Sequence, residues 1–208
     1  MALVARRSSV ALMLALALLA MVAVQRSDAA VTRNVSIVDN SFTPPNMTVN
    51  LGDTVVWTNN GSNPHTTTGK SPLGLWHSGT LSSGQSFTRV FDVAGSYAYV
   101  CNFHSGFGMV GRVSVRMKTS ATSGSVGTQF QLRHALNVAA APFVYDVQMK
   151  APGGAFKGFK SGTTQRSSVF NSTGKAAGTY EFRARIRNSS TGAISGWSPA
   201  RQITVTNP

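Results

Sequence analysis

A lone cysteine followed closely by a histidine and a methionine is the feature that most restricts the fold of this chain. Cys101, His104 and Met109 share one short segment, and β-rich runs at 97–101 and 111–115 lie on either side of it. A thiolate, an imidazole and a thioether form a soft ligand set, which suits copper far better than magnesium or calcium. The spacing therefore predicts a metal-bearing loop that joins two strands of a β-sandwich.

A second imidazole is available upstream, at His65 in the stretch Asn63-Pro64-His65-Thr66. A blue-copper centre combines two imidazoles and a thiolate with a weak axial methionine, an arrangement that both copper oxidation states tolerate. His65 is therefore the candidate for the second imidazole. The other histidines have no such neighbours, so we interpret His77 as a loop residue and His134 as a structural or exposed residue.

The N-terminal segment is typical of a secretory signal. Arg6 and Arg7 precede an apolar run over 10–24, and small residues surround Ala29. We expect cleavage after Ala29, so that 1–29 is a signal peptide and the mature chain is exported to a periplasm, a cell surface or the medium. The run is shorter than the roughly 20 residues that span a bilayer, and an uncleaved anchor is the alternative. After signal removal we expect no integral membrane span.

Export normally favours disulfides. Cys101 is the single cysteine, so it cannot form one within the chain and is a spare thiol, an intermolecular link or a metal ligand. Its neighbours favour the ligand.

The rest of the chain is predicted to be all-β. Short runs rich in β-branched and aromatic residues alternate with Gly, Pro and Asn turns, and no helical period follows residue 24. The runs are 35–38, 47–51, 54–57, 86–91, 97–101, 111–115, 129–132, 143–149, 168–170, 179–187 and 202–205. We expect a domain at 30–116, a flexible small-residue linker at 117–127 and a second β-sandwich at 128–208.

Positive charge is concentrated in the second half. Residues 117–208 contain eleven Lys and Arg against two acidic residues, which predicts long-range attraction to anionic partners. Along 180–187, apolar residues alternate with Arg183, Arg185 and Arg187, so the arginines share the exposed face of a strand. That face is either simply solvated or a docking surface for an anionic partner. We expect redox partner proteins, including acidic ones, and an anionic cell-surface component, but no nucleic acid.

Several segments resemble the plastocyanin and pseudoazurin branch of the cupredoxins. They are Tyr-Ala-Tyr-Val-Cys-Asn-Phe-His-Ser-Gly-Phe-Gly-Met at 97–109, Phe-Thr-Pro-Pro-Asn-Met-Thr-Val-Asn-Leu-Gly-Asp-Thr-Val-Val-Trp at 42–57, Pro64-His65, and 81–87. The resemblance implies a cupredoxin Greek-key β-sandwich and one type 1 copper ion. It implies His65, Cys101, His104 and Met109 as the ligands, with the outer edge of His104 as the electron exit. Thr66 takes a place where the family ties the two copper loops together.

The chain departs from the plant pattern beside the cysteine. Val100 stands where plant plastocyanins have a tyrosine that serves a second docking face, and the acidic patch beside that face is absent. Docking through negative charge is therefore not expected.

The second half is similar to fibronectin type III domains. The strand that Tyr180 begins, the Gly-Ala-Ile-Ser-Gly turn and Trp197-Ser198 carry this resemblance. It implies a spacer or a docking module, and the segment contains no recognisable catalytic group.

The function predicted from these features is that of an exported carrier of single electrons between redox partners. The alternative is a copper-binding module for metal storage or delivery, tethered by its second domain. We do not expect an enzyme, because a multicopper oxidase or nitrite reductase needs further histidine ligands and only His77 and His134 are left.

Overall fold

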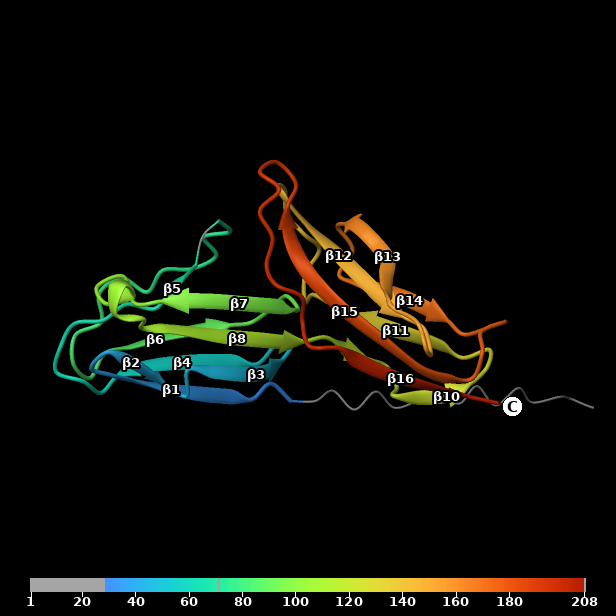
Figure 1. Cartoon of the computed structure of the whole chain (residues 1–208), viewed down its shortest axis with the longest axis horizontal. Helices are drawn as coiled ribbons and strands as arrows, with labels where there is room; N and C mark the ends of the chain where they lie inside the picture. Colours follow the sequence, from blue (N-terminus) through green and yellow to red (C-terminus); the bar gives the residue numbers. More distant parts are fainter. Residues whose placement is uncertain (1–28, 71, 208) are drawn as a thin grey trace, which may run out of the picture.

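The computed structural model describes residues 29–70 and 72–207, which form two β-sandwiches placed end to end (Figure 1). Its regular elements are strands apart from one short 3-10 helix, η1 (Ser105–Phe107). The predicted all-β fold is confirmed. The predicted signal peptide falls on 1–28, outside the described residues, apart from Ala29 at its end. No helix in the described part of the chain is long and apolar enough to cross a membrane.

The first sandwich consists of two four-stranded sheets, with strand orders β2-β1-β4-β6 and β3-β8-β7-β5. Its strands are β1 (Thr32–Val38), β2 (Ser41–Thr43), β3 (Asn46–Asn50), β4 (Thr54–Asn59), β5 (Thr68–Gly69), β6 (Ser86–Val90), β7 (Gly95–Val100) and β8 (Val110–Arg116). Two pairs, β1–β4 and β3–β8, are parallel, and each requires a connection that crosses between the sheets. The predicted strands of this half are all present.

An aromatic cluster fills the core of this sandwich, against the inward face of β7. Trp57 on β4 is fully buried, and its ring centroid lies 5.5 Å from that of Tyr99 and 6.2 Å from that of Trp76. Tyr97 and Tyr99 point inward because side chains alternate along a strand. Cys101 follows the last residue of β7, so this packed layer fixes the position from which the metal loop starts.

The second sandwich has sheets ordered β10-β16-β15-β12-β13 and β14-β11-β9. Its strands are β9 (Lys118–Thr119), β10 (Ser123–Ser125), β11 (Gln129–Arg133), β12 (Phe143–Lys150), β13 (Phe156–Thr163), β14 (Ser167–Asn171), β15 (Gly178–Asn188) and β16 (Arg201–Thr206). On β15 the apolar residues are buried and the arginines are not, as their alternation predicts. The hydroxyl of Tyr180 donates to Ala176 O at 2.9 Å and fixes the turn into β15.

The predicted flexible linker at 117–127 is wrong in part, because this segment is built into the second sandwich. Met117 is 1% exposed, β9 pairs with β11, and β10 pairs with β16 in parallel. The small residues allow close packing: a Cβ atom on Gly124 would lie 3.0 Å from the Phe130 ring. A composition typical of linkers here permits a tight approach of two chain segments.

The arginines of β15 are balanced within their own sheet. Arg185 Nε and Arg187 Nε each donate to Asp146 Oδ2, at 3.1 and 3.0 Å. Arg183 donates to Gln148 and lies over the rings of Phe156 and Trp197. Stacking and ion pairing therefore relieve the repulsion between neighbouring arginines.

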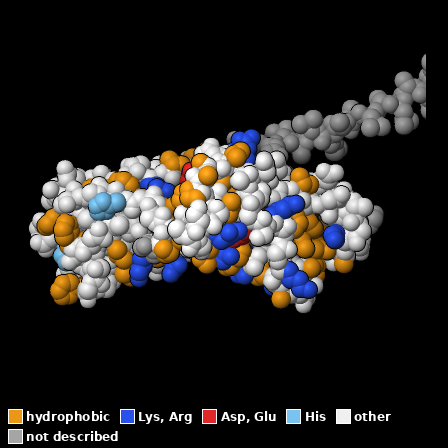
Figure 2. Space-filling view, turned by 90° about the horizontal axis from the view of Figure 1, so that it is seen from above, with side chains coloured by type: hydrophobic (Ala, Val, Ile, Leu, Met, Phe, Trp, Pro, Cys, Tyr) orange, Lys and Arg blue, Asp and Glu red, His pale blue; other side chains and the backbone are white. Residues whose placement is uncertain are grey.

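The two halves share backbone hydrogen bonds and core contacts. Ser96 and Gly196 exchange two N–H···O bonds of 2.9 Å, and Ala94 N donates to His134 O at 2.8 Å. Side chains of the second half complete the first core, among them Tyr145 and Ile186. The second half lies at the end of the first sandwich opposite the loop that follows β7 (Figure 1). Figure 2 shows lysine and arginine side chains spread over this second half, with few acidic ones.

Candidate metal centre

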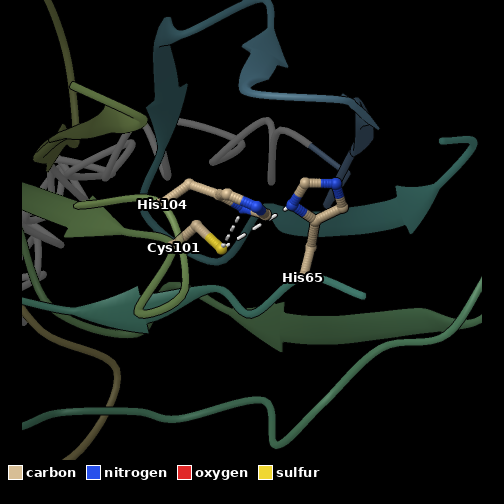
Figure 3. Close-up of side chains that lie close together, drawn as sticks. All are labelled: His65, Cys101 and His104. Carbon is tan, nitrogen blue, oxygen red and sulfur yellow. Dashed lines mark hydrogen bonds between the residues drawn. The ribbon is translucent and has the colours of Figure 1, made fainter. Parts of the chain in front are cut away.

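Three predicted ligands converge at the end of β7. The Cys101 Sγ atom lies 3.6 Å from His65 Nδ1 and 3.5 Å from His104 Nδ1 (Figure 3). One ligand atom from each residue lies within 4.8 Å of the other two. His65 and Cys101 are fully buried, whereas His104 is half-buried. Because the three donor atoms lie close together and two of the three residues are buried, this cluster fits a single soft metal ion.

The loop that carries Cys101 and His104 is closed by its own backbone. Cys101 N donates to Met109 O at 3.1 Å, and His104 N donates to Cys101 O at 3.3 Å. Helix η1 fills the turn and ends at Gly108, whose φ of 77° lies in the left-handed region that glycine adopts without strain. The loop therefore returns the chain to β8 while the side chains of Cys101 and His104 stay on the same side of the loop.

His65 comes from a separate connection, which is also held firmly. His65 and Leu81 exchange backbone hydrogen bonds of 3.1 and 2.7 Å. The buried amide of Asn59 donates to Asn63 O and Leu81 O, at 2.8 and 2.9 Å. Since backbone and side-chain bonds fix both sides of this loop, the imidazole is positioned before any metal binds.

Thr66 joins the two ligand loops, as the sequence predicts. Its hydroxyl accepts the Asn102 N–H at 2.9 Å, and its own N–H points to Cys101 Sγ at 3.4 Å. Hydrogen bonds around a ligating sulfur tune the electronic properties of a blue-copper site. Thr66 therefore contacts the Cys101 sulfur and also holds the two loops together.

A carboxylate lies behind His65. Asp39 Oδ1 is 3.5 Å from His65 Nε2, and it accepts the Asn63 N–H at 3.2 Å. That hydrogen bond is the main cause of the lowered pKa of Asp39, so the group is ionised. Burial lowers the pKa of His65 despite the opposing influence of Asp39. A neutral imidazole is the form that binds a metal.

Met109 begins the return from the loop and is 1% exposed. Around the loop, exposed apolar side chains form a rim: Phe107 is 81% exposed, Phe103 51% and Val110 50%. The ring centroids of Phe103 and Phe107 each lie 6.5 Å from that of His104. The edge of the site that reaches solvent therefore has an apolar surround.

Comparison with known proteins assigns the first half. Residues 29–116 match the family described as copper binding proteins, plastocyanin/azurin family. The plastocyanin of Scenedesmus fuscus is 36% identical over 84 residues, which cover 36% of this chain and 86% of that protein. The chain belongs to the plastocyanin/azurin family. A chloroplastic plastocyanin of Tetradesmus obliquus is 40% identical over 84 residues, and this chain spans 58% of its length.

Among solved structures, a purple cupredoxin from Nitrosopumilus maritimus is 32% identical and matches 40% of this chain and 98% of its own, with a TM-score of 0.37. Copper is the cofactor of this plastocyanin/azurin family member, and the soft donors of His65, Cys101 and His104 suit it.

The other two histidines, His77 and His134, lie outside the metal centre. His77 is exposed and bonds Thr68, and His134 is buried with Nε2 2.6 Å from Gln165 O.

The sequence did not indicate Asp39 as a neighbour of the site. Asp39 is separated from His65 along the chain, and no local motif joins them. The turn residues Asn60-Gly61 offered the nearest signal, because they predict a tight reversal before His65.

Proposed function

We propose that this chain is an exported carrier of single electrons, with one type 1 copper ion held by His65, Cys101, His104 and Met109. The observation that carries the proposal is the convergence of two imidazole nitrogens and one thiol sulfur within 4.8 Å in a plastocyanin/azurin family member. Copper, when bound, supplies a reversible one-electron change of oxidation state. Met109, buried in the same loop, is the proposed axial ligand.

The protein contributes a site that is rigid and largely buried, with only the edge of His104 near the solvent. Hydrogen bonds fix both ligand loops, which keeps the donors in one arrangement. Rigid ligands limit the reorganisation that slows electron transfer. The half-buried ring of His104, within the apolar rim of Phe103, Phe107 and Val110, is the proposed contact for redox partners. An apolar rim allows a partner to approach closely without stripping water from charged groups.

The second half is proposed to be a fibronectin type III-like domain that docks or retains the carrier. Its three-stranded and five-stranded sheets and the Tyr180–Ala176 hydrogen bond support this assignment, because such a tyrosine corner is common in sandwiches of this kind. Its excess of basic residues supports attraction to acidic redox proteins or to an anionic cell-surface component. Export and a first domain at 30–116 belong to the same proposal, with the second domain beginning at β9 rather than at residue 128.

The burial of the ligands gives a test that distinguishes an electron carrier from a module for copper storage or delivery. His65 and Cys101 are fully buried, so the copper-loaded chain is expected to retain its metal through repeated chemical reduction and oxidation. The measurement is bound copper per protein after ten cycles in the presence of a Cu(I) chelator. Stoichiometric retention supports the carrier, and quantitative loss on the first reduction supports storage or delivery instead.

A further inference from the structure

The exposed His77 is connected to the sulfur side of the metal centre through two threonine hydroxyls. His77 Nδ1 lies 2.8 Å from Thr68 Oγ1, and Thr68 Oγ1 lies 3.2 Å from Thr66 Oγ1. Thr66 in turn accepts the Asn102 N–H and directs its own N–H to Cys101 Sγ. A continuous hydrogen-bonded path therefore runs from solvent to the residue that joins the two ligand loops.

The donor and the acceptor in each hydrogen bond of this path follow from which groups have a proton to donate. The Asn102 N–H can only donate, so Thr66 Oγ1 accepts it and still has its own proton to place. Thr66 is 2% exposed, and in the described part of the chain Thr68 Oγ1 is the partner recorded for that proton. Thr68 then donates to His77 Nδ1, which requires the imidazole proton on Nε2. The reverse direction would leave a buried hydroxyl proton unpaired, which is costly.

The backbone holds His77 opposite Thr68. The two residues form an antiparallel bridge, flanked by hydrogen bonds from Gly69 N to Trp76 O at 3.0 Å and from Ser78 N to Thr67 O at 3.1 Å. The Trp76 indole, buried in the core, further anchors this segment by donating to Thr67 Oγ1 at 3.3 Å. The His77 ring is thus placed by the sandwich itself, although the ring is exposed.

We propose that His77 is a positioning residue for the copper thiolate. By accepting the Thr68 proton it orients the threonine pair that keeps the Thr66 N–H on Cys101 Sγ. This inference rests on the proposed function. An N–H bond to sulfur withdraws electron density from the thiolate, which favours the reduced metal and raises the reduction potential. Loss of the acceptor at position 77 loosens that bond and lowers the potential.

The test compares variants of the copper-loaded mature chain by voltammetry. His77→Phe removes the acceptor and keeps a ring, whereas His77→Asn places an amide oxygen near the former Nδ1. Thr68→Val removes the relay, and Thr68→Ser retains it. We expect equal downward shifts in potential for His77→Phe and Thr68→Val, no further shift in the double variant, and wild-type values for His77→Asn and Thr68→Ser. A wild-type potential in His77→Phe, shifts that add in the double variant, or failure of His77→Asn to restore the potential would overturn the proposal.

A second measurement is independent of copper. In the metal-free wild-type chain at pH 8, the ¹⁵N shifts of the imidazole nitrogens should show the proton of His77 on Nε2 and a hydrogen-bonded, unprotonated Nδ1. A proton on Nδ1 contradicts the relay. Absence of a thiolate-to-copper band in the loaded wild-type chain would instead refute the proposed function, so the two failures are distinguishable.

Discussion

The carboxylate of Asp39 lies 3.5 Å from the Nε2 atom of His65, on the side of the ring away from Cys101. Metal-binding histidines commonly direct their second nitrogen to a carboxylate, which orients the ring and raises its basicity. Asp39 is itself fixed by Asn63 N and Ser62 Oγ, each at 3.2 Å. A negative charge is therefore built into the surroundings of one copper ligand.

Replacement of Asp39 by Asn should weaken copper binding by roughly 10-fold or more, a typical cost of losing such a partner. The reduction potential should rise, because removal of a negative charge disfavours the oxidised metal more than the reduced one. Competition titration and voltammetry measure the two effects. Asp92→Asn, an acidic residue outside the metal site, is the matched control. Equal affinities for Asp39→Asn and wild type would show that the carboxylate does not support His65.

Gly111 faces the ring of Tyr99 so closely that an added Cβ would overlap it. Tyr99 is 1% exposed and packs on Trp57, so it has no room to move. Gly111→Ala should lower the free energy of unfolding by about 1–3 kcal/mol, the usual cost of overpacking a core. Gly106→Ala, where a Cβ meets no neighbour within 4 Å, is the control. Urea denaturation measures both, and a neutral Gly111→Ala would contradict the packing described.

The ionised side chain of Asp146 is expected to make the stability of the second half sensitive to acid. Burial opposes ionisation of this carboxyl, but hydrogen bonds from Arg187, Gly162 N and Arg185 outweigh it and lower the pKa from 3.8 to about 2. A depressed folded-state pKa contributes stability that is complete above the unfolded value and is lost as pH falls from about 4 to about 2. The unfolding free energy of the wild type should therefore fall across this window.

Asp146→Asn should lose that contribution at neutral pH and show a flatter profile between pH 4 and pH 2. Urea denaturation at a series of pH values measures the difference between the two chains. A difference that does not change across this window would mean that Asp146 is not ionised against its arginines in the folded state.

Tyr180→Phe removes the hydroxyl that bonds Ala176 O. Tyr180 is 3% exposed, and a hydrogen bond of this kind contributes about 1 kcal/mol. The variant should be less stable by about that amount, measured by thermal or urea unfolding. Its copper spectrum should match that of the wild type, because Tyr180 lies in the half of the molecule remote from Cys101; an altered spectrum would contradict the separation of the two functions.

The metal loop could be predicted because two of its ligands lie close together in the sequence. Cys101 and His104 lie on one segment, and His65 stands in a turn of recognisable composition. The contacts of Asp39 with His65 and of His77 with Thr68 depend on how distant connections fold back, which no local pattern records. Strand β13 was not predicted, because its glycines and lysines outnumber the two phenylalanines, Phe156 and Phe159, that contact side chains of β15. The segment 117–127 was predicted to be a flexible linker because its residues are small. Small residues, however, permit close packing as well as flexibility.

The visible and EPR spectra of the copper-loaded mature chain test the central claim most directly. We predict an intense thiolate-to-copper band with narrow copper hyperfine splitting, lost in Cys101→Ser while the circular dichroism of the β-sandwiches is retained. A folded, copper-loaded wild-type chain without that band, or a Cys101→Ser chain that keeps it, would contradict a type 1 centre built on Cys101, His65 and His104.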